Sequence, residues 1–207
     1  RGAGDLLGGE QSGFINEIGF ETYQKILAEA IDELKEKEFK DLYSGTEHEK
    51  KDFVKETVID TDFELLFPDD YVNNITERLN LYTKLNAITD EAGLKTFEKE
   101  LIDRFGALPE PVIDLLNSVR IKWIALAMGL ERVVMKKGKL VGYFVSDQQS
   151  AYYQSAVFSQ VLQFVQNHSL RVKMKEKQTR NGLRLLLTID KVTSVANALA
   201  ILEKFQK

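Results

Sequence analysis

The sequence contains no cysteine, only three prolines and only two histidines among its 207 residues. Without a thiol the chain has no disulfide, no thiolate zinc site, no iron–sulfur cluster and no cysteine nucleophile. No apolar run approaches the roughly 18 to 20 residues that a membrane-spanning helix needs, so we expect no membrane partner. A chain without cysteine fits a reducing compartment, and we expect a cytoplasmic protein.

Motifs that carry catalysis are also missing. His48 lies in a polar stretch and His168 at the end of a predicted helix, and neither has a second histidine at the spacing of a metal site. There is no Gly-x-Ser-x-Gly elbow and no Gly-x-x-x-x-Gly-Lys-Ser/Thr loop. The aspartates between residues 60 and 70 are typical of turns and strand edges. We therefore predict a chain that is not an enzyme, with no catalytic residue, no metal and no cofactor of its own.

Charge is nearly balanced, with 28 Lys and Arg against 32 Asp and Glu, a net charge of −4. Such a chain has no global attraction for phosphate, so any nucleic-acid contact must come from a local patch. Residues 136–139 carry three lysines, and residues 171–180 carry five basic residues, of which Arg171, Lys173 and Lys175 alternate and share one face of a predicted strand. These segments form either a nucleic-acid-binding module or a solvated face that keeps the sheet soluble.

Glycine is concentrated at one end of the chain. Six of the 13 glycines lie in the first 19 residues, which predicts a loop or hook, because each glycine inside a helix or strand costs about 0.5–1 kcal/mol. Apolar residues then recur at helical spacing from Phe20 to Leu34. We predict three segments: a hook and helix over residues 1–39, a mobile polar linker over residues 40–56, and a second unit over residues 57–207.

The second unit begins with a strand-like segment, residues 57–67, and continues with three predicted helices. The first helix begins with a capping box of Asn74 and Glu77. The second begins at Thr89 or Asp90 and stops at Gly106. The third begins at Pro109 or Pro111. The third helix, through Met128, is apolar almost all round. We therefore expect it at the buried centre of the fold.

The last third of the chain predicts a small sheet and two helices. Strand-like runs lie at residues 130–135, 140–145, 169–175 and 183–189, and helical spacing returns at residues 151–166 and 192–205. The strands form two pairs, the second joined by Asn181-Gly182, a strong hairpin signal. The predicted fold class is α+β, with a helical subdomain packed with a small antiparallel or mixed sheet.

Two groups of residues resemble a known family. The run from Arg1 to Gly13, Arg-Gly-Ala-Gly-Asp-Leu-Leu-Gly-Gly-Glu-Gln-Ser-Gly, followed by Ile18-Gly19-Phe20, resembles the translocation motif of RecG and Mfd DNA translocases. The segments Leu66–Val72, Arg78–Tyr82 and Glu100–Pro109 resemble, in order and spacing, the C-terminal domain of the Mfd family of bacterial transcription-repair coupling factors. The resemblance covers essentially the whole chain.

The resemblance implies that residues 1–39 are the tail of a motor lobe whose ATP and Mg²⁺ site lies outside this chain. The translocation-motif residues are Arg1, Gly2, Gly4, Gly8, Gln11 and Gly13. Among them, Arg1 and Gln11 match the family's functional arginine and glutamine. Members of the family are ATP-dependent translocases that couple DNA repair to stalled transcription, with UvrA, RNA polymerase and duplex DNA as partners. A start at Arg1 fits a piece of such a protein.

The resemblance also makes residues 57–207 a regulatory domain without catalysis. In the family this domain packs against the N-terminal UvrB-like module of the same protein and hides the surface that recruits UvrA. Glu100 and Asp103 match the acidic pair of that interface, and their spacing places them side by side on a helix. The alternative is local pairing, of Glu100 with Arg104 and of Asp103 with Lys99, worth about 0.3–0.5 kcal/mol each.

Overall fold

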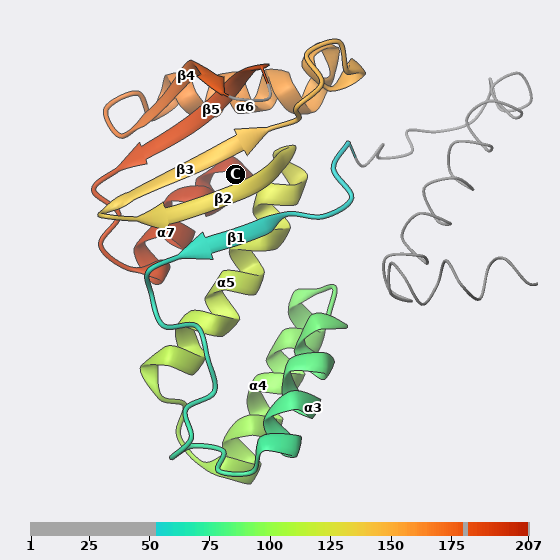
Figure 1. The fold of residues 1–207 in the computed structure, drawn as a ribbon, viewed down its shortest axis with the longest axis vertical. Coiled ribbons are helices and arrows are strands. Elements are labelled where there is room, and N and C mark those ends of the chain that lie inside the picture. The colour runs from blue at the N-terminus through green and yellow to red at the C-terminus, as the bar shows by residue number, and fades with distance from the viewer. Residues whose placement is uncertain (1–52, 180–181, 207) are drawn as a thin grey trace, which may run out of the picture. The chain divides into compact units, whose positions relative to one another are not determined.

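The computed structural model describes residues 53–179 and 182–206. The chain divides into two units, residues 1–50 and 51–207, and every described residue belongs to the second (Figure 1). The predicted hook and helix over residues 1–39, and the predicted linker up to residue 52, lie outside the described residues. The three-segment organisation therefore stays a prediction.

The second unit is α+β, as predicted, with three helices in succession after the first strand and two strand pairs, each followed by a helix (Figure 1). In chain order they are β1 (Val58–Thr61), α3 (Ile75–Asn86), α4 (Glu91–Phe105), α5 (Glu110–Ala127), β2 (Leu130–Lys136), β3 (Lys139–Phe144), the 3₁₀ turn η1 (Ala151–Gln154), α6 (Ala156–Asn167), β4 (Val172–Thr179), β5 (Gly182–Asp190), α7 (Val195–Leu202) and the 3₁₀ turn η2 (Glu203–Gln206).

Local capping determines where the helices begin and end. Asn74 accepts a hydrogen bond from the N–H of Glu77 at 3.0 Å, and Asp90 accepts one from the N–H of Gly93 at 2.7 Å. Each side chain satisfies one of the backbone donors that have no partner at a helix start. Gly106, with a φ of 89°, ends α4. The predicted starts of α3 and α4 and the predicted stop of α4 are confirmed.

The strand predicted over residues 57–67 is only partly right, because it ends at Thr61. The hydroxyl of Thr61 accepts a hydrogen bond from the N–H of Phe63 at 3.1 Å, which turns the chain out of the sheet. Phe67 is then buried among the helices, and its N–H donates to the Tyr82 hydroxyl at 2.9 Å. The two ends of this segment are therefore buried in different cores, and a continuous strand cannot serve both.

Five strands form one mixed sheet in the order β1-β2-β3-β5-β4. β1 is parallel to β2, and the other neighbours are antiparallel. The β2–β3 hairpin turns at Lys137 and Gly138, both at positive φ, as a two-residue turn of this kind requires. Both predicted strand pairs are confirmed, and the sheet is mixed because β1 joins it.

Two apolar cores lie on either side of α5's midpoint. One contains buried residues of α3 and α4 and is completed by Val112 and Leu116 of α5. The other contains the inner face of the sheet with α6 and α7, and takes Ile121, Ile124 and Ala125 from α5. The prediction of a buried central helix is confirmed, and α5 is the element that joins the two cores (Figure 1).

Candidate functional site

The acidic pair of the predicted interface lies on α4, and its two members have different surroundings. The side chain of Glu100 is 31% exposed. Its carboxylate accepts a hydrogen bond from Nζ of Lys84 on α3 and lies 3.6 Å from the guanidinium of Arg104. The hydrogen bond from Lys84 holds the pKa of Glu100 below its ordinary value. Glu100 therefore already has cationic partners inside the domain, one of them the Arg104 that local pairing predicts.

Asp103 is exposed, and no described residue gives it a hydrogen bond or an ion pair. The local pair with Lys99 does not form, although both lie on the same side of α4. Four exposed residues at helical spacing make up what we call the outer face of α4: Ala92, Thr96, Lys99 and Asp103. This face carries an available carboxylate, and none of the described residues covers it.

Ion pairs on one flank of α4 join it to α3. Arg104 reaches Glu77 of α3 at 2.8 Å and lies over the ring of Phe105, with 4.9 Å from its guanidinium carbon to the ring centre. The Glu77 carboxylate thus forms an ion pair with a residue of α4. It does not accept a hydrogen bond from the N–H of Asn74, which would be the second bond of the predicted capping box. Together with the Lys84–Glu100 pair, this contact fixes the position of α4 against α3 at two points.

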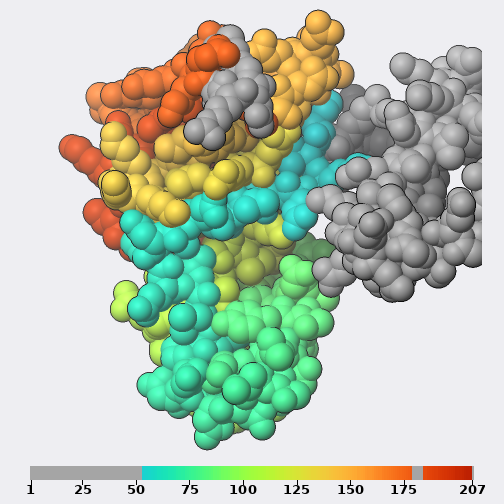
Figure 2. All heavy atoms as spheres, viewed as in Figure 1, coloured from blue at the N-terminus to red at the C-terminus, as the bar shows by residue number. Residues whose placement is uncertain are grey.

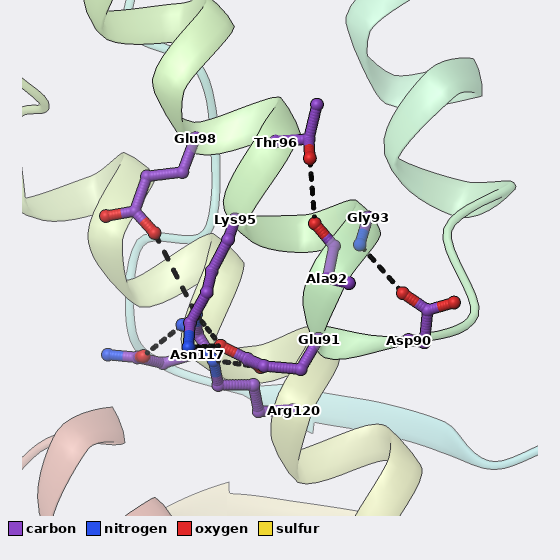
Figure 3. Close-up of polar contacts among 9 residues, drawn as sticks. All are labelled: Asp90, Glu91, Ala92, Gly93, Lys95, Thr96, Glu98, Asn117 and Arg120. Atoms are coloured by element: carbon purple, nitrogen blue, oxygen red, sulfur yellow. Dashed lines mark hydrogen bonds and ion pairs between the residues drawn. The ribbon is translucent and has the colours of Figure 1, made fainter.

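Ion pairs on the other flank join α4 to α5 (Figure 3). The guanidinium of Arg120 on α5 donates to both oxygens of Glu91, at 2.9 and 2.8 Å, and also reaches Asn117 at 3.1 Å and Glu98 at 3.9 Å. The bidentate geometry is the strong form of this interaction. It lowers the pKa of Glu91 and raises that of Arg120. α4 is therefore held from both flanks, and its outer face is presented on a fixed helix.

No sequence pattern singled out Arg120, although it joins α4 to α5. Its partner Glu91 lies 29 residues away, on a different helix. Spacing rules within one helix reach only three or four residues. The one local signal was an arginine among the apolar residues of the second half of α5, which predicts that a partner exists without saying which residue it is.

Charge is divided between two parts of the domain. The helical part, residues 63–128, has 7 basic and 11 acidic residues and a formal charge of −4. The sheet part, residues 53–62 with β1 together with residues 129–206, has 13 basic and 8 acidic residues and a formal charge of +5. The acidic pair thus lies in an acidic part, whereas both basic segments of the sequence lie in the other. The net charge of the whole chain hides this division.

The remaining predicted residues have structural surroundings or lie outside the described part. Asp60 pairs with Arg132, Asp62 accepts the N–H of Lys137 at 3.1 Å, and Asp69 pairs with Arg78 at 2.7 Å. These contacts agree with the turn and strand-edge interpretation. In residues 53–179 and 182–206, no three acidic, histidine or cysteine side chains gather as a metal ion would require.

Several predicted positions are not among the described residues. They are Arg1, Gly2, Gly4, Gly8, Gln11, Gly13, His48 and Arg180. His168 ends α6, with its Nδ1 2.9 Å from the carbonyl oxygen of Phe164. None of the helices in the described ranges is long and apolar enough to cross a membrane.

Comparison with protein families identifies the segment that carries the acidic pair. Residues 61–155 match the TRCF domain. This segment contains α3, α4 and α5 with Glu100 and Asp103, and the β2–β3 hairpin. The TRCF domain match therefore includes the whole helical part and the first hairpin of the sheet part.

Relatives of the chain carry the name transcription-repair-coupling factor. The Escherichia coli protein is 36% identical over 134 residues, which are 64% of this chain and 11% of that protein. The protein of Haemophilus influenzae is 29% identical over 202 residues, 95% of this chain and 17% of that protein. The chain thus spans less than a fifth of the length of these relatives.

A solved structure has the same fold. It is the crystal structure of the C-terminal domain of a transcription-repair coupling factor, with a TM-score of 0.57 and 18% identity. The match covers 73% of this chain and 92% of that domain. At this identity the likeness establishes the fold of the TRCF-matching part and its neighbours, and function must be argued from the residues.

Proposed function

We propose that this chain is a part of an ATP-dependent DNA translocase that couples DNA repair to stalled transcription, and that residues 57–207 are its non-catalytic regulatory domain. The match to the TRCF domain and the names of the relatives support this proposal. Residues 1–39 would couple the motor to movement on duplex DNA, with Arg1 and Gln11 in the translocation motif. ATP and Mg²⁺ would bind to the motor outside this chain, in a cytoplasmic protein that also engages RNA polymerase and UvrA.

The regulatory role we propose is autoinhibition. The domain would dock on the N-terminal UvrB-like module of its own protein and mask the surface that binds UvrA. The observation that carries this proposal is the outer face of α4, where Asp103 is exposed and has no described partner. An unpaired carboxylate on a helix held from both flanks is suited to meet a cation of another module without reorganising.

Glu100 and Asp103 would have different roles in that contact. Asp103 would receive an arginine or lysine of the partner directly, in a charge-assisted hydrogen bond worth about 1.5–3 kcal/mol. Glu100 would act mainly through Lys84 and Arg104, which it holds in place. A partner cation reaching Glu100 would have to displace one of these two. The negative charge of the helical part would speed the approach of a basic partner surface.

The test is binding of the full 207-residue chain to the isolated N-terminal module, measured by calorimetry, with UvrA as a competitor for the module. We expect a complex that excludes UvrA. Asp103→Arg should weaken it at least tenfold, because the substitution places like charges opposite each other. Glu100→Gln should weaken it less, since Arg104 also pairs with Glu77 and keeps that contact when the charge of Glu100 is removed.

Glu64→Arg is the matched control, because Glu64 is also exposed, acidic and in the helical part, but its neighbours Phe63 and Leu65 pack against the core of the sheet part. It should change the affinity less than twofold. Absence of binding, or equal losses in the two charge-reversal variants, would contradict the proposed interface. A complex that binds UvrA as well as the free module does would contradict the masking role alone.

A further inference from the structure

The sheet has one face packed against helices and a second face turned away from them. Alternate residues such as Met135, Leu140 and Leu187 are fully buried in the core with α5, α6 and α7. The residues between them point to the other side, which we call the outer face of the sheet. Among the described residues, no helix lies in front of the strands on this side (Figures 1 and 2). This face is separate from the outer face of α4.

The centre of the outer face is apolar and contains one aromatic ring. The strand register places Val134 opposite Val141, and Tyr143 opposite Leu186. Tyr143 is half-buried and lies on β3, the central strand of the sheet. The face therefore has an apolar centre with an aromatic side chain in it. Arg132, opposite Tyr143, and Arg184, opposite Lys177, lie on the same face, and each already forms an ion pair within the domain.

A row of lysines borders this apolar centre along the edge strand β4. Lys173, Lys175 and Lys177 are exposed and alternate along the strand, so that they share the outer face at intervals of about 7 Å. Lys173 lies 3.8 Å from Asp190. Lys175 and Lys177 have no acidic partner in the described part of the chain. The row therefore carries positive charge that the domain itself does not neutralise.

We propose that the outer face of the sheet binds a single strand of DNA, with phosphates along Lys173, Lys175 and Lys177 and a base stacked on Tyr143. The +5 charge of the sheet part complements a polyanion, and regularly spaced lysines suit a phosphate backbone. Only an unpaired base exposes its ring face for stacking on an aromatic side chain, which favours a single strand over a duplex. The valine and leucine side chains suit contact with the 5-methyl group of thymine, which uracil lacks, and this favours DNA over RNA.

The test uses the full chain and a fluorescein-labelled oligothymidylate of 20 nucleotides, with anisotropy measured from 50 to 200 mM salt. We expect salt-sensitive binding. The triple variant K173Q/K175Q/K177Q should bind on the order of tenfold more weakly and lower the salt slope by about 2, since each lost phosphate contact removes roughly 0.7. Tyr143→Leu should weaken binding on the order of tenfold at an unchanged salt slope, because stacking carries no charge.

The matched control is K95Q/K122Q/K204Q, which removes three lysines from helical surfaces and changes the net charge equally. It should keep the affinity within twofold. Equal losses in the two triple variants would overturn the site, as would unchanged binding in Tyr143→Leu. Tighter binding of a duplex or of oligouridylate would overturn the assignment to single-stranded DNA. Competition by polyglutamate as effective as that by oligothymidylate would assign the face to an acidic protein instead.

Discussion

The helical and sheet parts of this domain present opposite charge, and each keeps its unpaired charge on an outward face. In the helical part, three carboxylates on α3 and α4 form ion pairs between helices, and Asp103 stays available. In the sheet part, Asp190 neutralises two of the lysines, whereas Lys175 has no described acidic partner. The comparison shows that a net charge of −4 can describe a chain with two differently charged surfaces.

The largest expected effect concerns the packing of the sheet part. Gly129 has a φ of 76°, and a Cβ built on it would lie 2.2 Å from a ring carbon of Tyr152, which is fully buried. Gly129→Ala therefore combines an unfavourable backbone conformation with an overpacked core. We expect a loss of about 3 kcal/mol or more in the free energy of unfolding, measured by urea denaturation.

Gly138→Ala separates these two causes. Gly138 has a φ of 71°, but the nearest atom to its Cβ would be 3.8 Å away, the carbonyl oxygen of Val192. Only the backbone cost remains, and we expect a loss of about 1 kcal/mol. Equal losses in the two glycine variants would show that Tyr152 does not restrict position 129.

The sequence predicts those features of the fold that depend on neighbours in the chain. Asn74 and Asp90 cap helices through residues three positions away, and the Lys137-Gly138 turn closes a hairpin between adjacent strands. Such signals require only local spacing. The fold class, the helix ends and the strand pairs follow from them.

Features that depend on distant residues could not be predicted in the same way. β1 pairs with residues of β2 that lie 74 positions further along the chain, as the register of Val58 with Arg132 shows. The Arg120–Glu91 pair and the burial of Tyr152 beneath Gly129 have no local signature either. For the candidate site, spacing placed Glu100 and Asp103 side by side. Spacing did not show that Lys84, 16 residues before Glu100, forms an ion pair with Glu100 and not with Asp103.

The next largest effect concerns the core of the helical part. Leu101 is fully buried between α3, α4 and α5. Leu101→Ala should cost 2–5 kcal/mol, roughly, because it leaves a cavity among helices. Trp123 on α5 packs against the same core, so its fluorescence reports this part, whereas far-UV circular dichroism reports both.

Comparing the unfolding transitions reported by the two probes tests whether the two cores, joined by α5, unfold together. We expect the fluorescence and circular dichroism transitions of Leu101→Ala to shift together, since α5 contributes buried residues to both cores. A fluorescence transition that precedes the circular dichroism transition would show instead that the helical part unfolds separately from the sheet part.

A smaller effect is expected where α4 meets α5. Arg120→Lys keeps the positive charge but loses the bidentate contact with Glu91, and it should cost about 1 kcal/mol in urea denaturation. Lys95→Gln is the control, because Lys95 lies 4.0 Å from the same carboxylate and is largely exposed. It should cost less than about 0.5 kcal/mol. A larger loss in the control would mean that Arg120 does not hold α4.

The smallest expected effect distinguishes Glu100 from Asp103 by what each side chain contributes to the stability of the fold. The pKa of Glu100 is lowered in the folded state, so its contribution to stability is present above the ordinary value of 4.5 and is lost as the pH falls through the lowered pKa. Glu100→Gln should therefore lose less stability than the parent chain between pH 6 and pH 3. Asp103 has no described partner, and Asp103→Asn should change the free energy of unfolding at pH 7 by less than about 0.5 kcal/mol. If Asp103→Asn destabilised the domain by more than this, Asp103 would be stabilising the fold, and its carboxylate would not be available for a partner.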